Sequence, residues 1–200
     1  MPFDRSLISV EQAREYLGVR GSGEDRLLGE IVKAATDLAE AITDRKLKTR
    51  TYALGGDEAA FVLNGNGQRA LRLPQSPVTA ISKVEFLTSD SPEVWEEQSL
   101  STYPVTIDPD VPGRIVYRAS AFPRGVLNVK VSATCGYVSI PENLTFAIRE
   151  LVLSLYRQKD KQLAGVASRT FEGQTTTYDL DAVPKQVILL LEPFRRMECV

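Results

Sequence analysis

The spacing of apolar residues changes twice along the chain, and this change restricts the fold more than any other feature of the sequence. From Glu24 to about Lys46 the apolar residues recur at the spacing of an amphipathic helix. From Thr49 to Tyr137 the period falls to two, and Gly and Pro separate short segments. Helical spacing returns at Leu144, Ala147, Ile148, Leu151, Val152 and Leu155. The pattern predicts an α+β fold, in which a helical body is interrupted by an inserted β-rich module.

The same pattern divides the chain into three parts. We expect residues 1–48 to form two N-terminal helices and residues 49–137 to form the β-module. Residues 138–200 should form one long and one short C-terminal helix, the short one over Val183–Arg196, and complete the helical body. Gly and Thr clusters with little periodicity predict a flexible loop at 163–179, as a mobile segment or a loose hairpin.

Capping residues mark the ends of two expected helices. Ser9 and Gln12 have the spacing of a capping box, and Gly18 is expected to end the short helix that follows. Ser139 with Glu142 predicts a second capped start, with Pro141 in the first turn.

Alternation predicts which residues of the β-module face its core. The expected buried sets are Val129, Val131, Ala133 and Cys135, then Ala80, Ser82, Val84 and Phe86, and the pair Ile115 and Tyr117. The segment Asn64-Gly65-Asn66-Gly67 lacks the pattern of a phosphate-binding loop, and we interpret it as a hairpin turn.

The residue inventory argues against catalysis. The chain has no histidine, which excludes His-based catalytic triads and the usual Cys/His zinc sites. The two cysteines, Cys135 and Cys199, do not support a disulfide framework, and a reducing compartment is expected. Glu96-Glu97 and Asp108-Pro109-Asp110 lack the surroundings of an acid/base pair or a calcium loop. We therefore expect no catalytic residue, metal or cofactor, and a protein that is not an enzyme; a Ser-Lys or paired-carboxylate enzyme is the weakest alternative.

Charge and hydropathy restrict the partners. Lys and Arg total 24 against 26 for Asp and Glu, a net charge of -2, and no part of the chain is strongly basic. A protein that reads DNA is normally far more basic. No apolar run approaches the roughly 18 residues of a membrane helix, and the N-terminal residues lack a signal peptide's apolar centre. The expectation is a cytosolic product without membrane contact.

Two groups of side chains have both an ordinary and a functional interpretation. Trp95 and Tyr103 fit core or edge packing, but they also permit an alternative function in which the β-module binds carbohydrate or peptide. The basic residues on or just beyond the long C-terminal helix fit a solvated helix end or a phosphate contact: Arg149, Arg157, Lys159 and Lys161.

A series of motifs runs through nearly the whole chain in a fixed order. It contains ISVEQAREYLGV, an alanine-rich helix, LRLPQSPVTAISKVEFL, YPVTIDPDVPGRIVY, VKVSATCGYVSIPENLTFAIRELVLSLY and VPKQVILLLEPFRR. The order and spacing of these motifs resemble the head-tail connector (adaptor, or head completion) family of tailed bacteriophages and prophages. Phe122-Pro123 stands where that family usually has Trp-Pro, and Cys135-Gly136 where it often has Ala-Gly.

The resemblance implies a structural virion protein at the head-tail junction, present in the host bacterial cytoplasm during assembly. It implies a homo-oligomeric ring of about a dozen copies, bound to the portal protein and to a stopper or tail-completion protein. DNA would pass through the ring without sequence-specific binding.

Within that family, flexible loops and the C-terminal tail complete the joints to neighbouring proteins. The resulting candidate subunit or portal contacts are Arg149, Arg157, Lys159, Lys161, Arg169, Phe171, Phe194, Arg195 and Arg196.

Overall fold

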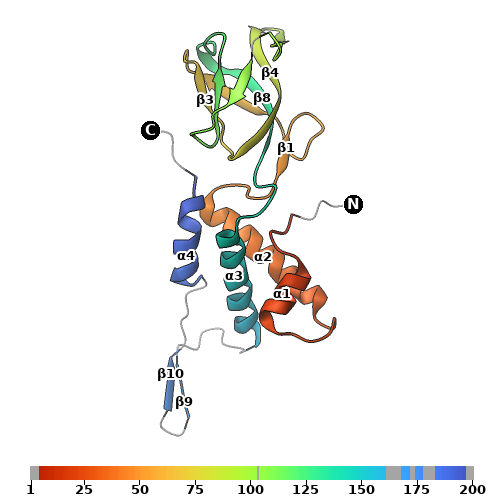
Figure 1. The fold of residues 1–200 in the computed structure, drawn as a ribbon, viewed down its shortest axis with the longest axis vertical. Helices are drawn as coiled ribbons and strands as arrows, with labels where there is room; N and C mark the ends of the chain where they lie inside the picture. The colour runs from red at the N-terminus through yellow and green to blue at the C-terminus, as the bar shows by residue number, and fades with distance from the viewer. Residues whose placement is uncertain (1–4, 103, 161–167, 172–173, 178–182, 197–200) are drawn as a thin grey trace. The chain divides into compact units, whose positions relative to one another are not determined.

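The computed structural model describes residues 5–102, 104–160, 168–171, 174–177 and 183–196. It contains both helices and strands, as predicted, and the chain divides into two compact units. The helical unit combines the described residues up to Asp44 with those of Ser139–Arg196. The β unit is formed by Arg45–Val138. Figure 1 shows the elements of both units.

The helical unit is built from amphipathic helices that bury one face each. Its helices are α1 (Val10–Leu17), α2 (Asp25–Thr43), α3 (Glu142–Asp160) and α4 (Lys185–Leu191), followed by the 3-10 helix η1 (Glu192–Phe194). Helix α2 packs against α3, α1 contacts both, and α4 packs on α3 and α2. The buried apolar side chains of these helices are Ala13, Leu28, Ile31, Val32, Ala35, Ala39, Leu144, Ala147, Ile148, Leu151, Val152, Val187 and Leu191.

A capping box begins α1, and residues with left-handed backbone conformations end α1 and α2. The capping box of α1 is confirmed, because the Ser9 hydroxyl accepts from the Gln12 N–H at 3.2 Å and the Gln12 side chain accepts from the Ser9 N–H at 2.9 Å. Gly18 ends α1 with a φ of 69°, in the left-handed region. Helix α2 ends at Thr43, earlier than expected, because Asp44 takes a φ of 51°.

The predicted cap of α3 is wrong. The carbonyl oxygen of Pro141 accepts the first helical hydrogen bond, from the Thr145 N–H at 2.9 Å. This bond makes Pro141 itself the N-cap, where its missing N–H has no role, and leaves Ser139 two residues outside the helix.

The polar segment before α4 contains a hairpin, one of the two predicted alternatives. Strands β9 (Ser168–Phe171) and β10 (Gln174–Thr177) pair antiparallel. The other residues of the expected loop at 163–179 lie outside the described residues.

The β unit contains two antiparallel sheets. The strands of the five-stranded sheet are β1 (Arg50–Tyr52), β2 (Phe61–Gly65), β4 (Val78–Asp90), β5 (Glu93–Glu97) and β8 (Gly125–Cys135). The strands of the three-stranded sheet are β3 (Ala70–Arg72), β6 (Val105–Ile107) and β7 (Arg114–Tyr117). Strand β8 pairs with β1, β2 and β4, whereas β5 pairs only with β4 and forms an edge of its sheet.

One hydrophobic core lies between the two sheets. The predicted inward residues of β8 are all buried, as are Ile115 and Tyr117 of β7. Phe86, Tyr117 and Phe122 meet at ring-centroid distances of 5.6 to 6.3 Å, so aromatic contacts join the sheets.

The predicted alternation of β4 is partly wrong. Val84 is buried and Phe86 packs against the core, but Ala80 and Ser82 are exposed. The pairing of β4 with β8 shifts register before Ala80 and again after Ile81, and each shift exchanges the two faces of the strand. Between the two shifts Ile81 packs against the core in place of Ala80 and Ser82, whereas Val78 before them and Val84 after them are buried, as simple alternation predicts.

The turn predicted at Asn64–Gly67 is not a hairpin. Strand β2 before it pairs with β8, whereas β3 after it pairs with β7 of the other sheet. The segment is therefore a corner between sheets. Gly65 is required there, because a Cβ at this position would lie 1.7 Å from the Pro123 carbonyl oxygen.

The chain enters and leaves the β unit at adjacent positions. The Tyr137 N–H donates to the Leu47 carbonyl oxygen at 2.8 Å, and the Thr49 N–H donates to the Tyr137 carbonyl oxygen at 3.3 Å. Gly136 makes this close approach possible: its φ is 106°, and a Cβ there would lie 2.5 Å from the Lys48 carbonyl oxygen. We call this pairing the entry-exit clasp.

Substitution of Gly136 tests the clasp. We expect Gly136→Ala to lower the free energy of unfolding by about 2 kcal/mol or more, because the change combines left-handed strain with a backbone clash. Gly23→Ala is the matched control, since Gly23 has no positive φ and open space around it. Chemical denaturation measures both variants, and equal stabilities would refute this account of Gly136.

A second prediction concerns the core thiol. Burial raises the pKa of Cys135 to about 12, so its reactive thiolate is scarce at neutral pH. In a Cys199→Ser background we expect no reaction with an aromatic disulfide reagent at pH 8 while the protein is folded. One thiol per chain should react after addition of denaturant, and rapid labelling of the folded protein would contradict the buried position.

Candidate interaction surface

The basic residues predicted on α3 lie in different environments. Arg149 is half-buried and faces α1, with its guanidinium carbon 5.9 Å from the centre of the Tyr16 ring. Its Nε atom is buried and has no hydrogen-bond partner among the described residues. Arg157, two turns further along, is exposed. Arg157 is thus presented to solvent, whereas Arg149 is engaged within the helical unit.

A hydrogen bond beside Arg149 joins the same two helices. The hydroxyl of Tyr16 on α1 donates to the Glu150 carboxylate on α3. This bond, followed by burial, raises the pKa of Tyr16. Sequence reasoning missed Tyr16 and Glu150, because no local pattern shows that these two side chains, which are distant in sequence, meet between two helices.

The side chains of four candidate contacts lie outside the described part of the structure. Lys159 belongs to the last turn of α3, and Arg169 and Phe171 belong to β9, but their side chains lie outside the described part of the structure. Lys161 lies outside it altogether.

The three C-terminal candidates lie near the end of α2. The Arg196 N–H donates to the Thr43 carbonyl oxygen at 2.8 Å, and its guanidinium lies 3.4 Å from the Asp44 carboxylate. Positive charge is favourable at this end of a helix. Arg195 is exposed and lies 3.8 Å from Glu192, and Phe194 is half-buried. Main-chain bonding therefore anchors this segment and presents its arginines at the surface.

An apolar surface on α4 was not predicted. Val187 and Leu191 face the unit's interior, whereas Ile188 and Leu189 are 41% and 74% exposed. The signal was present in the sequence, because the run Val187–Leu191 has five successive apolar residues and one helix face cannot bury them all. We call Ile188 and Leu189 the α4 patch.

Trp95, one of the two aromatic residues of the alternative carbohydrate or peptide site, makes contacts within the β unit. The Lys130 ammonium lies 3.8 Å from the centre of the Trp95 ring, and the Trp95 indole N–H donates to the Glu93 carboxylate. One face of the ring is thus covered by a contact within the β unit, and Trp95 is half-buried. Tyr103 lies outside the described residues.

The described ranges contain neither a candidate metal site nor a candidate membrane-spanning helix. In the described ranges there is no group of three or more His, Cys, Asp or Glu side chains that could hold a metal ion. None of the helices in these ranges has the length and apolar character needed to cross a membrane.

The family is decided by a match over almost the entire chain. The model of the head completion protein family matches residues 6–197. The chain belongs to this family. No curated protein matches this head completion family member.

Two solved structures share its fold. One is a chain from the neck of an empty GTA particle computed with C6 symmetry, with 18% identity and a TM-score of 0.65, covering 100% of this chain and 95% of that one. The other is from the neck of a native GTA particle computed with C12 symmetry, with 18% identity and a TM-score of 0.60, covering 96% of this chain and 90% of that one. At this identity the likeness establishes the fold.

The acidic turn of this family member has a structural role. The Asp108 carboxylate accepts from the Asp110 N–H at 2.9 Å and the Val111 N–H at 3.3 Å, and its other oxygen lies 2.6 Å from Arg114. These bonds, the one from Asp110 first, lower the pKa of Asp108. The Asp108 carboxylate thus bonds within its own turn and to the strand that follows it.

The lowered pKa of Asp108 predicts a pH dependence. The stabilisation it provides is complete above the ordinary carboxyl pKa and is lost as the pH falls through the lower folded-state value. We therefore expect Asp108→Asn to be less stable than wild type at pH 7, with a smaller difference at pH 3. Asp110→Asn, at an exposed carboxylate in the same turn, is the control. A difference from wild type that is independent of pH would contradict the assignment.

Proposed function

We propose that the protein is a non-enzymatic structural component of the head-tail junction of a phage or prophage particle. About a dozen copies form a closed ring, which joins the portal to the stopper or tail-completion protein and lets DNA pass. The observation that carries this proposal is the family match over residues 6–197. It is supported by full-length fold likeness to neck chains from particles computed with C6 and C12 symmetry.

The division of the chain supports the corresponding domain organisation. We propose that the helical unit is the body that assembles, completed by chain segments on either side of the inserted β-module. The division falls at Asp44 and Arg45 and again at Val138 and Ser139. Buried Ala35 and Ala39 pack α2 inside the unit, while Ala34 and Ala41 on its exposed side permit close approach of another helix.

The charge balance fits a conduit for DNA. Each basic contact with phosphate adds to sequence-independent affinity, so a strongly basic lining would hold the duplex that must leave. A net charge of -2 is compatible with passage of DNA without specific binding. The proposed place of action is the virion, after assembly in the host bacterial cytoplasm.

Exposed side chains at the end of α3, on α4 and directly after η1 are the proposed contacts with the portal or a neighbouring copy. Arg157, Arg195 and Arg196 supply positive charge, and the α4 patch supplies apolar area. Lys159, Lys161, Arg169 and Phe171 stay candidates on the sequence argument, and Arg149 is the one most engaged within its own unit.

The α4 patch gives the sharpest test. Leu189→Asp removes an apolar contact and places a charge in the proposed interface, whereas its cost to the folded subunit is small because the side chain is 74% exposed. We expect portal-bound rings of wild type in electron micrographs and at least about tenfold weaker ring formation by the variant.

Leu54→Asp is the matched control, since Leu54 is fully exposed in the β unit. We expect this variant to assemble like wild type. If wild-type protein mixed with its portal forms no ring under any assembly condition, the proposed function is wrong. If Leu189→Asp assembles normally, the α4 patch is not a contact.

A further inference from the structure

Charge is distributed unevenly within the β unit. The hairpin of β4 and β5 (residues 78–97) has one lysine and five carboxylates. Residues 66–72 and 104–124, which contain all strands of the other sheet, have five arginines and two aspartates. The two sheets thus carry surfaces of opposite sign.

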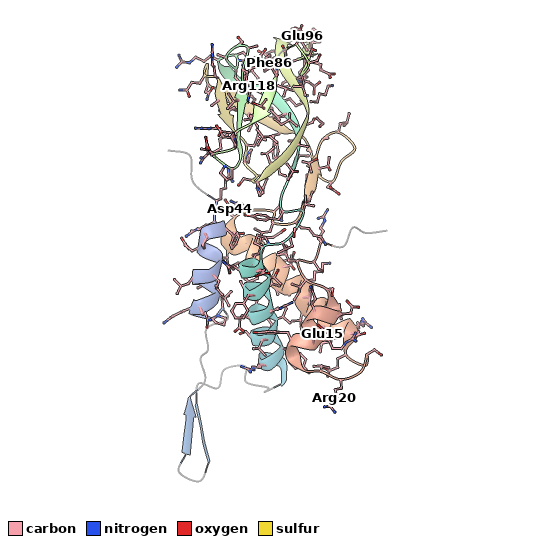
Figure 2. All side chains as sticks on the ribbon, in the orientation of Figure 1. Glu15, Arg20, Asp44, Phe86, Glu96 and Arg118 are labelled. Atoms are coloured by element: carbon pink, nitrogen blue, oxygen red, sulfur yellow. The ribbon has the colours of Figure 1, made fainter. Side chains whose placement is uncertain are left out.

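The negative surface, which we call the acidic hairpin, consists of Asp90, Glu93 and Glu96. All three are exposed, and Glu96 lies on the edge strand β5 (Figure 2). The hairpin's lysine, Lys83, is already paired with Glu85 at 2.9 Å and Glu97 at 3.3 Å. Among the described residues, no basic side chain forms an ion pair with Asp90 or Glu96. The acidic hairpin therefore retains its charge.

The positive surface, which we call the arginine cluster, consists of Arg69, Arg118 and Arg124. Main-chain bonds bring these segments together: the Tyr117 N–H donates to the Arg69 carbonyl oxygen at 2.7 Å, and the Arg124 side chain lies against Gly67. All three arginines are exposed, and Figure 2 labels Arg118. No described carboxylate pairs with any of them; Arg118 instead donates to the Thr106 hydroxyl at 3.2 Å.

A ring built from one kind of chain needs two different and complementary faces on every copy. The acidic hairpin and the arginine cluster have complementary charge, come from different sheets and are not neutralised within the copy that carries them. We infer that the acidic hairpin of one copy docks on the arginine cluster of the next copy around the ring. This inference rests on the proposed ring and assigns the β unit to the contact between copies.

Such a contact contributes more to the correct orientation of the copies than to the strength of their association. An exposed ion pair contributes little by itself and is weakened by salt. Several pairs repeated at every junction favour the correct orientation of each copy, because head-to-head or tail-to-tail contacts place like charges together. The contact thus directs assembly toward a closed ring of uniform orientation.

Charge reversal tests the inference with two variants of the full-length protein. The hairpin variant contains Asp90→Lys and Glu96→Lys, and the cluster variant contains Arg69→Glu and Arg124→Glu. We expect each variant alone to form portal-bound rings at least about tenfold less well than wild type, because like charges then meet at every junction. An equal mixture of the two should restore rings, since alternating copies match at every junction of an even-numbered ring. One chain with all four substitutions should restore them as well.

The control reverses two charges in the helical unit, with Glu15→Lys and Arg20→Glu, at exposed positions labelled in Figure 2. It should assemble like wild type. Normal assembly of both charge-reversal variants, or failure of the mixture and of the four-substitution chain to recover while circular dichroism shows folded protein, would overturn the inference. In either case wild-type rings on the portal would leave the proposed function standing, whereas their absence would refute the function itself.

Discussion

Strand β8 is the element on which the β unit depends. It pairs with β1, β2 and β4, so three strands from different parts of the chain receive their register from one backbone. Its inward side chains Val129, Val131, Ala133 and Cys135 are almost completely buried and supply much of the shared core. Sheet pairing and hydrophobic burial thus act through the same residues, and the acidic hairpin and arginine cluster are presented on a scaffold that β8 holds together.

Strong periodicity and local capping made part of this structure predictable. The buried stripe of α2, the capping box of Ser9 and Gln12, and the alternation of β8 each follow from a pattern contained in a few neighbouring residues. The predictions that failed depend on distant partners. Ala80 and Ser82 are exposed because β4 shifts register against a strand about 50 residues away in sequence. The hairpin predicted at Asn64–Gly67 failed for the same reason, since no local signal shows which strand will pair with β3.

Prediction of the candidate contact residues is limited in the same way, because their exposure depends on distant partners. Basic residues at the end of a helix are visible in a sequence, but whether they face solvent or a neighbouring helix is not. Arg149 and Arg157 are both on α3, yet the first meets the Tyr16 ring and the second is exposed. The α4 patch could have been found, because a short helix with five successive apolar residues must leave some of them uncovered. The arginine cluster could be found only from the strand pairing, since Arg69 is far from Arg118 and Arg124 in the sequence.

The entry-exit clasp has a consequence for the order in which the protein is made. Helix α2 needs α3 to cover its apolar face, but the residues of the β unit are synthesised between them. At roughly 5–20 residues per second the ribosome would leave that face open for several seconds. A β unit that folds first brings Leu47 beside Tyr137 and replaces a long, entropically costly loop closure by a short one. In that order of folding, the β unit shortens the loop that must close before α3 can cover α2.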